Sequence, residues 1–588
     1  MNQNYAVYTV EAECQDCYKC VRSCPVKAIK IERARAAVVP ELCVACGRCV
    51  GVCPSGAKKI RGDAGRVRAL MASGRPVYAS LAPTYAGTMR GWTEGALAGA
   101  LKRLGFAGVS ETALGAELVS RRIREELAKG GRKLHLSTAC PAAVDYVVRH
   151  RPELREHLMG WTSPMVAHAR LIRSWFGEEA AVVFIGPCAA KKKEADEFPG
   201  DVDAALTFSE LKEWLAVAKE APGAGGDAAE GFVPRRASEG AIYAVAGGMI
   251  ETLKGGDSPD GVAMLTVSGM EYMQQTLAAL DETELEHPVF VELLACEGGC
   301  VNGPGRGADD AVLSGEVAVR WRARGGGRPA EPASAPDITR RIAPGAGANA
   351  VHSEKDIVAA LRRVGKQGPE EELNCGGCGY DTCRAFAAGL LEGRAEPSMC
   401  LSFLRRQAQK KANALLRCMP SGVVIADAKL QIVECNERFA RLFGEETMLG
   451  YQARPGMEGA KLERIVPFAG LFRDVLDKNR ERRSAMVRLG DKLLEVTVFV
   501  IEPRQIVGGI LSDVTRTEVR REQIAQRARE VIEKNLATVQ EVACKLGEHM
   551  ADTEILLRSI AEDYADDEDY LKRPEGFARL TPPGGPGA

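Results

Sequence analysis

The sequence predicts a multidomain α/β protein. Its 588 residues are enough for roughly four domains of ordinary size. Between about residues 75 and 322, short apolar segments alternate with helical patterns, which is typical of an α/β domain. Runs of closely spaced cysteines lie on both sides of this region, and residues 323–352 are rich in Gly, Pro and Ala, which predicts a linker.

Composition narrows the class of protein. The formal net charge is −1 with 27% charged residues, so nothing in the overall charge favours a nucleic-acid partner. We find no run of about 18 apolar residues and no secretory leader at the start, and therefore expect a cytoplasmic protein that does not enter a membrane. Sixteen of the 19 cysteines fall in metal-ligand spacings, which require reduced thiolates. The other three are expected in the core or at the surface, with a redox-ligand role as the alternative for the first two: Cys418, Cys435 and Cys544.

The first 62 residues contain two runs of four cysteines, each with C-x2-C-x2-C-x3-C-P spacing. This pattern resembles bacterial two-cluster ferredoxins, in which the fourth cysteine of each run binds the other 4Fe-4S cluster. Zinc is the alternative, but it needs only four ligands. The resemblance implies two ligand sets: Cys14, Cys17, Cys20 and Cys53 for one cluster, and Cys43, Cys46, Cys49 and Cys24 for the other.

Residues 75–322 contain segments that read as buried strands followed by loops with Gly, Pro or Ser. They begin at Val77, Lys133, Ala180 and Val262, and helical patterns such as 112–127 and 209–219 lie between them. Three loops in this region carry cysteines in LSTACPAAV, FIGPCAAKKKEA and VELLACEGGCVNGPG. Open α/β sheets bind ligands in such loops.

These three segments resemble the active-site motifs of FeFe (iron-only) hydrogenases. The resemblance implies an α/β catalytic domain that carries an H-cluster, which is a 4Fe-4S cluster joined to a two-iron subsite with CO, cyanide and a dithiolate. Cys300 would bridge the two parts, and Lys191 would donate to a cyanide ligand. The alternative for Lys191 is a solvated basic run with Lys192 and Lys193. The implied ligands of the 4Fe-4S part are Cys140, Cys188, Cys296 and Cys300.

The sequence also departs from ordinary members of this family. Ala139 occupies the position of a proton-relaying cysteine, and a methyl group carries no proton. Residues 119–123 lack the relay glutamates, so that Glu126 is the acid left from that chain. Gly186 and Leu294 replace two methionines that pack the two-iron subsite. Such losses predict slow turnover, which suits a hydrogen sensor.

Beyond the linker, four cysteines with x2, x4 and x16 spacing resemble a small 4Fe-4S domain, with zinc as the alternative: Cys375, Cys378, Cys383 and Cys400. Residues 410–515 resemble an α+β PAS domain, which senses or relays signals, and 516–565 read as a helix that pairs in a dimeric coiled coil. The lone amphipathic helix is the alternative there. The predicted domains are the two-cluster ferredoxin domain at 1–62, the hydrogenase-type domain at 75–322 and, after a linker at 323–352, the small 4Fe-4S domain at 353–408. They are followed by the PAS domain at 410–515, the signalling helix at 516–565 and a disordered tail at 566–588.

Three functions fit these features. The first is a sensory FeFe hydrogenase that passes its redox state through iron-sulfur clusters and the PAS domain to a kinase, phosphatase or regulator. The second is a catalytic hydrogenase that exchanges electrons with ferredoxin. The third is an iron-sulfur assembly or electron-carrier protein that never receives the two-iron subsite. Under the first two, H2 and protons are the substrates.

Overall fold

The computed structural model describes residues 5–222, 231–255, 261–307, 311–324, 335–345, 352–478, 480–515 and 530–535. The chain divides into two compact units, Met1–Met399 and Cys400–Ala588, and each is described by itself. No described helix is long and apolar enough to span a membrane. The expected tail at 566–588 lies outside the described residues, as does the expected signalling helix apart from 530–535.

The first part of unit 1 is small and pseudo-symmetric. Strands β1 (Val7–Thr9) and β4 (Lys58–Ile60) form one antiparallel pair, and β2 (Ile29–Glu32) and β3 (Arg35–Val38) form another. The short helices α1 (Lys19–Ser23) and α2 (Arg48–Gly51) each contain the third cysteine of a run. We call residues 5–62 the ferredoxin module. A module of this length can bury only a small hydrophobic core.

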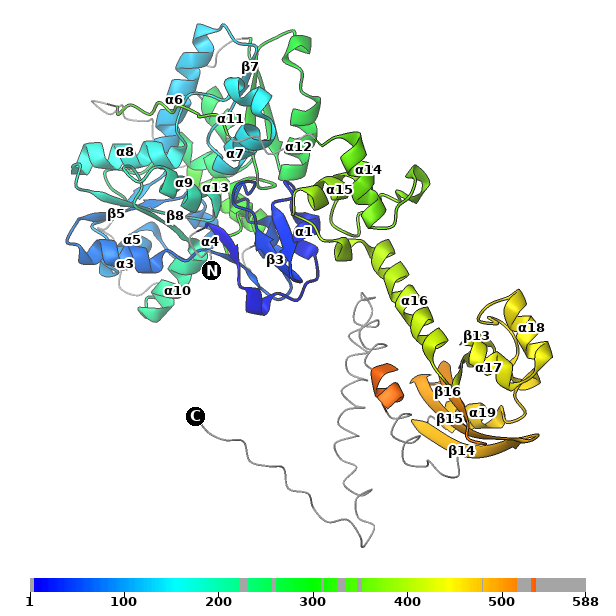
Figure 1. The fold of residues 1–588 in the computed structure, drawn as a ribbon. Helices are drawn as coiled ribbons and strands as arrows, with labels where there is room; N and C mark the ends of the chain where they lie inside the picture. The colour runs from blue at the N-terminus through cyan, green and yellow to red at the C-terminus, as the bar shows by residue number, and fades with distance from the viewer. Residues whose placement is uncertain are drawn as a thin grey trace, which may run out of the picture. The chain divides into compact units, whose positions relative to one another are not determined.

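The next part contains two parallel sheets (Figure 1). The larger has the order β6 (Gly108–Glu111), β5 (Val77–Leu81), β8 (Ala181–Gly186), β9 (Ala204–Thr207). Its strands are buried on both faces, as parallel strands between helices must be. Side chains from α5 (Glu94–Arg103), α8 (Pro164–Phe176) and α10 (Phe208–Val217) complete this core.

The smaller sheet has the order β10 (Ala263–Ser268), β11 (Val289–Leu294), β7 (Leu134–Leu136). Its core includes residues of α6 (Ala113–Lys129), α8 and α11 (Gly248–Lys254). The expectation that the segment at Val262 forms a buried strand is wrong, because β10 lies at an edge and Leu265 is 54% exposed. The sequence interpretation did not identify β6, β9 and β11 as strands, although strands are placed where it expected them at Val77, Lys133 and Ala180.

Part of the expected linker is ordered against this domain. α13 (Val312–Ala323) runs into it, and residues 335–345 follow after a gap. Ile338 is buried and its carbonyl accepts a hydrogen bond from the Thr162 amide at 2.9 Å, while the Arg340 amide donates to Gly160 at 2.8 Å. The sequence interpretation missed this ordered segment because it is rich in Gly and Pro. Its packing depends on few apolar side chains, such as Ile338, which give no recognisable pattern.

Unit 1 ends in a small domain with α14 (Glu354–Arg363) and α15 (Cys383–Leu391), which pack through Leu361 and Ala387. Unit 2 begins with the exposed helix α16 (Leu401–Cys418). This helix crosses the boundary that the sequence interpretation placed between 408 and 410. A five-stranded antiparallel sheet follows, with the order β13 (Ile432–Cys435), β12 (Gly422–Asp427), β16 (Ile506–Asp513), β15 (Lys492–Glu502), β14 (Arg482–Leu489).

Helices α17 (Glu437–Leu442), α18 (Glu445–Ala453) and α19 (Gly470–Lys478) accompany this sheet. Asn436 caps α17: its side-chain oxygen accepts from the amides of Phe439 and Val423, each at 2.9 Å. Phe472 and Phe439 fill the core between helices and sheet. The single asparagine thereby fixes the corner between β13 and α17.

Candidate functional site

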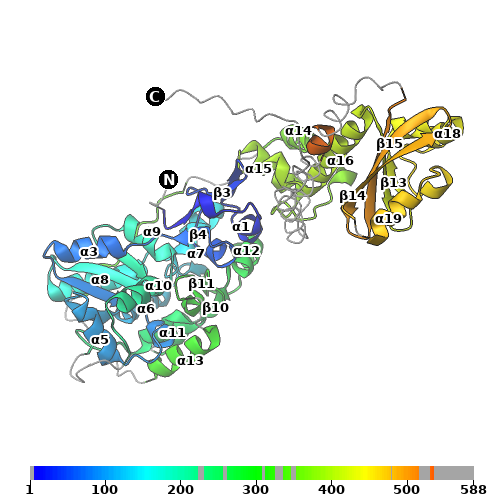
Figure 2. The ribbon, with the colours of Figure 1, turned by 90° about the horizontal axis from the view of Figure 1, so that it is seen from below.

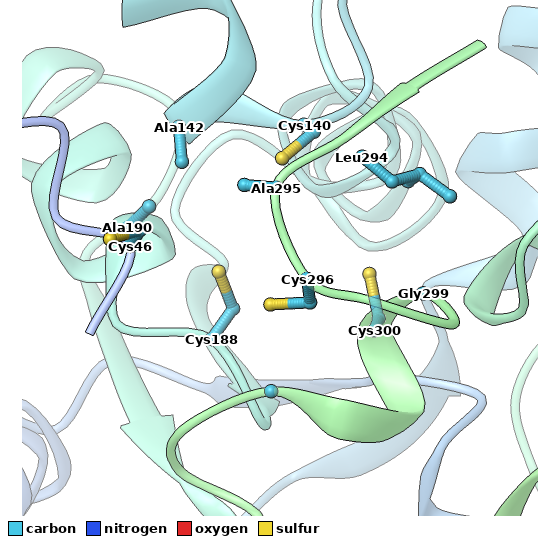
Figure 3. Close-up of a pocket in the computed structure, with 11 residues that line it drawn as sticks. Cys46, Cys140, Ala142, Cys188, Ala190, Leu294, Ala295, Cys296, Gly299 and Cys300 are labelled. Atoms are coloured by element: carbon cyan, nitrogen blue, oxygen red, sulfur yellow. The ribbon is translucent and has the colours of Figure 1, made fainter. Parts of the chain in front are cut away.

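Five cysteines line one apolar cavity in unit 1, and four of them belong to the α/β domain, so we call it the four-thiol cavity (Figure 3). Cys140, Cys188, Cys296 and Cys300 come from three loops that follow β7, β8 and β11. These strands are parallel members of two sheets, so their carboxyl ends deliver the loops to one place. The structure therefore brings together all four residues that the sequence singled out here.

Two of these cysteines precede helices. Cys140 is the N-cap residue of α7 (Pro141–His150). The first helical residue is a proline, and its missing N–H costs nothing there because a helix leaves its first amides without a partner. Cys188 lies two residues before α9 (Ala190–Glu197). The positive end of a helix stabilises a thiolate close to it, which suits both cysteines as metal ligands.

The third loop depends on glycines at close contacts. Gly299 has a φ of +102°, and a Cβ there would lie 2.7 Å from the Ala244 carbonyl oxygen. A Cβ on Gly303 would lie 2.5 Å from the Pro187 carbonyl oxygen, next to Cys188. Any other residue at either position would push the loops apart. The glycines thus set the spacing between the cysteines of two different loops.

Burial favours the protonated form of three of these thiols. It raises the pKa of Cys188 to about 11 and that of Cys300 to about 12, and it raises the pKa of Cys296 as well. Neighbouring thiols add to each shift, while Lys191 opposes it at Cys188 and Cys300. Four thiolates in an apolar cavity need positive charge at its centre, which an iron-sulfur cluster supplies.

The donor set fits a cluster better than a single ion. Within the ranges that the structure describes, no group of three or more His, Cys, Asp or Glu side chains is arranged to hold one metal ion. A zinc site needs all of its ligands within bonding distance of one point. A 4Fe-4S cluster instead takes its thiolates from separate directions around a cavity, as these loops present them.

Lys191 lies beside the cavity at the start of α9. Its Nζ donates to Glu194 Oε2 at 2.7 Å and to the Ala139 carbonyl oxygen at 3.4 Å. Glu194 also accepts from Ser163 Oγ at 2.9 Å. Lys191 is only 9% exposed, and Lys192 is fully buried and hydrogen-bonded to Glu210. A solvated basic run, the alternative for these lysines, is therefore contradicted.

On the side that faces α6, the residues near Ala139 supply little for proton transfer. Ala139 packs at the edge of an apolar cluster with Met159 and Leu171. On α6, Val119 and Ile123 are buried in the same cluster, and Ser120 Oγ pairs with the Tyr243 hydroxyl at 2.8 Å. Glu126 lies further along α6, where its charge raises the pKa of His135 against the larger effect of burial.

The space beside Gly186 is already filled by an aromatic ring. A Cβ on Gly186 would lie 2.5 Å from Phe184 Cζ, and Phe184 is itself buried. Leu294 lines the cavity, as expected from its place before Cys296. The sequence comparison identified the lost methionine at Gly186, but the ring that replaces its volume became visible only in the structure.

The cysteines of the ferredoxin module gather in two groups. The charges of Cys14, Cys17 and Cys53 all raise the pKa of Cys20, after the larger effect of burial. Burial raises the pKa of Cys46 to about 12, and the nearby Cys24 and Cys43 add to this shift. Cys49 lies close to Cys24, Cys43 and Cys46. The fourth cysteine of each run thus lies nearer the other run.

One of these groups adjoins the cavity. Cys46 is among its lining residues, and a Cβ on the following Gly47 would lie 2.4 Å from Pro304 Cγ. Arg149 donates to the Pro40 carbonyl oxygen at 2.9 Å, and His150 is hydrogen-bonded to the Leu42 carbonyl oxygen at 3.1 Å. This side of the ferredoxin module is therefore held against the cavity.

Three cysteines of the small domain lie at its surface or near it. Cys375 is exposed, Cys378 is half-buried, and Cys383 is buried at the start of α15. The Cys383 amide donates to Asn374 Oδ1 at 2.7 Å. Cys400 belongs to unit 2, where it is buried and 3.3 Å from Ser402 Oγ.

Two of the three remaining cysteines lie among the described residues. Cys435 is buried in the core of unit 2, and Cys418 is exposed at the end of α16. Cys544 lies outside the described residues. Their placement agrees with the expectation of core and surface positions for the two that are described.

Known family models match four parts of the chain. Residues 75–304 match the iron only hydrogenase large subunit, C-terminal domain. Residues 13–57 match a 4Fe-4S dicluster domain, 371–402 an Fe-S cluster family, and 411–484 a PAS domain. The chain thus combines a hydrogenase-type α/β domain with iron-sulfur and PAS domains.

Curated relatives are distant. The periplasmic [Fe] hydrogenase large subunit of Nitratidesulfovibrio vulgaris is 25% identical over 370 residues, which cover 52% of this chain and 86% of that protein. The NADP-reducing hydrogenase subunit HndD of Solidesulfovibrio fructosivorans is 27% identical over 265 residues, which cover 36% of this chain and 45% of that protein. A solved FeFe-hydrogenase from Chlamydomonas reinhardtii is 19% identical, with a TM-score of 0.34, and covers 43% of this chain and 88% of that structure.

Proposed function

We propose that the chain is a sensory FeFe hydrogenase that binds H2 at the four-thiol cavity and turns it over slowly. Ala139 next to the cavity ligand Cys140 carries this proposal, because it leaves the proton path without its innermost group. The PAS match and the loss of the relay glutamates on α6 support a role in signalling rather than in bulk hydrogen metabolism.

Each residue at the cavity has a defined task in this proposal. Cys140, Cys188, Cys296 and Cys300 would hold the H-cluster, with Cys300 shared with its two-iron subsite. When bound, that group supplies the metal site at which H2 is split or formed. Lys191 would face an anionic ligand there while Glu194 and the Ala139 carbonyl fix its direction. The apolar lining excludes water from the reacting atoms.

The ferredoxin module would carry electrons to or from this cavity. The contacts of Gly47 and Arg149 support that role, since they hold the group that contains Cys46 against the cavity. Further iron-sulfur ligands would be Cys375, Cys378, Cys383 and Cys400. The signal would pass to a kinase, phosphatase or regulator in the cytoplasm, from a homodimer formed through the PAS domain and the following helix.

The rate of hydrogen turnover tests the proposal. Protein that has been matured with a synthetic two-iron cofactor should oxidise and evolve H2 slowly, and Ala139→Cys should raise both rates by about 100-fold, the range of one positioned proton-transfer group. Ala139→Ser is the size-matched control with a much weaker acid. Fast turnover by the unmodified chain would favour the second candidate, a catalytic hydrogenase that uses ferredoxin.

A further inference from the structure

The small domain is fixed to the ferredoxin module through Gly379. Lys27 Nζ donates to the Gly379 carbonyl oxygen at 2.8 Å and lies 3.5 Å from Asp381. Gly379 has a φ of +90°, and a Cβ there would lie 2.7 Å from Val21 Cγ1 and 3.1 Å from the Arg22 amide nitrogen. The two backbones therefore approach as closely as a glycine permits.

A second strip of contacts runs along β2. The Ile31 amide donates to the Arg394 carbonyl oxygen at 3.3 Å, and Arg394 Nη1 donates to the Lys27 carbonyl oxygen at 3.2 Å. The Arg33 amide donates to Glu396 Oε1 at 3.1 Å. Backbone groups take part on both sides, so one relative orientation is specified. Figures 1 and 2 both show α15 next to the ferredoxin module.

Tyr380 follows Gly379 and is buried beside this contact. It is 2% exposed, and its ring packs 5.7 Å from that of Phe386 on α15. The thiols of Cys378 and Cys24 are both close enough to raise its pKa, an effect that adds to the larger one of burial. Tyr380 is therefore a buried side chain beside the contact between Gly379 and the Val21–Arg22 segment, which leads to Cys24.

Cys24 connects this contact to the cavity. It lies with Cys43, Cys46 and Cys49, and Cys46 lines the four-thiol cavity. The same group of cysteines thus adjoins the cavity on one side and the small domain on the other. The last predicted ligand of the small domain, Cys400, is the N-cap residue of α16, which runs on to the PAS domain.

We propose that the small domain is the internal electron acceptor of the ferredoxin module, reached through the Gly379–Tyr380 segment. For each electron that the ferredoxin module loses, the small domain gains one, and no bond forms or breaks. The electrons come from the oxidation of H2 to two protons and two electrons, so this inference rests on the proposed function. It makes the cysteine group with Cys24 a branch point between the cavity and the signalling half of the chain.

Magnetic coupling between reduced clusters tests this contact without hydrogen or the two-iron subsite. The full chain is reconstituted with iron and sulfide, reduced with dithionite and measured by electron paramagnetic resonance. The small-domain signal is the one lost in Cys375→Ser. We expect this signal to be broadened by coupling to the ferredoxin module, and the broadening to be lost in Gly379→Ala.

Gly393→Ala is the matched control. Gly393 lies in the same small domain with a φ of +69°, but a Cβ there would meet nothing within 4 Å. It carries the same kind of backbone strain without disturbing the contact, and should keep the broadening. Lys27→Met removes the donor to Gly379, and its control is Lys30→Met, because Lys30 pairs with Glu32 on the same strand.

An unbroadened small-domain signal in the unmodified chain would overturn the inference. So would broadening that survives both Gly379→Ala and Lys27→Met. If Gly379→Ala does not retain its clusters, Lys27→Met decides alone. Failure of the proposed function can be told apart from failure of this inference. A chain that shows no infrared bands of CO and cyanide after maturation with the two-iron cofactor would still show this magnetic coupling.

Discussion

Lys191 is the residue whose role depends most on its immediate partners. Its ammonium is held by Glu194 and the Ala139 carbonyl, and it is almost fully buried. Loss of a charge-assisted hydrogen bond costs about 1.5–3 kcal/mol, so Lys191→Met should retain the two-iron subsite at least tenfold more weakly. Infrared absorption of the bound CO and cyanide after maturation measures this retention.

Lys193→Met serves as the control for that experiment. Lys193 is on the same helix but is hydrogen-bonded to Asp145, away from Glu194. It should keep normal infrared bands. Equal loss of the bands in both variants would show that positive charge on α9, and not the position of Lys191, retains the subsite.

His168 makes the hydrogenase-type domain sensitive to acid. It is completely buried, with ring nitrogens 2.7 Å from Ser80 Oγ and 2.9 Å from Ser110 Oγ, and burial lowers its pKa to about 3. The unfolded chain binds a proton near pH 6.5 and the folded chain does not. Stability from this residue is therefore full above pH 6.5 and falls by about 1.4 kcal/mol per pH unit below it.

Hydrogen-exchange protection of α8 amides measures this effect between pH 7 and 5.5. The protection should fall with pH in the unmodified chain and less steeply in His168→Gln, which keeps a donor and an acceptor but does not titrate. Parallel slopes in the two proteins would place the acid sensitivity in another group.

The loop after β11 depends on one of two neighbouring glycines. Both Gly298 and Gly299 have positive φ, but a Cβ meets nothing within 4 Å at Gly298 and lies 2.7 Å from the Ala244 carbonyl oxygen at Gly299. Gly299→Ala should therefore displace Cys300 and reduce the iron bound at the cavity, while Gly298→Ala should suffer only the shared backbone strain of about 1 kcal/mol. Iron content per chain and visible absorption check this difference.

The resemblance of three segments to the hydrogenase motifs identified the four cavity cysteines at the sequence level, and each segment follows a predicted strand. The pairing of β7 and β8 with different sheets was not visible, since hydrophobic runs do not reveal which strands become neighbours. β10 looked buried for the same reason. The anchoring of 335–345 through Ile338 was also missed, because its surroundings read as a flexible segment.

Contacts between segments far apart in the chain could not be predicted from the sequence. The sequence interpretation assigned no role to Gly379, whereas its approach to Val21 in the structure requires a glycine. Likewise, Lys192 looked like part of a surface run but is buried between Asp63 and Glu210. Burial of a charge can be recognised only when its partners from other elements are known.

At the scale of the whole molecule, the described contacts connect the cavity to the ferredoxin module and the ferredoxin module to the small domain. All of these contacts lie within unit 1, whereas the PAS domain belongs to unit 2, together with α16. This division fits a molecule in which hydrogen chemistry and signal output are carried by different parts. A sensory hydrogenase requires first that the four-thiol cavity holds the two-iron subsite and that this subsite responds to hydrogen.

Infrared spectroscopy of the matured full chain, recorded under argon and then under H2, tests that claim most directly. We expect CO and cyanide bands that change when hydrogen is admitted, and that are absent from Cys300→Ser prepared in the same way. A chain that contains its iron and sulfide but shows no such bands would contradict the proposed sensory hydrogenase and favour an electron-carrier or assembly protein.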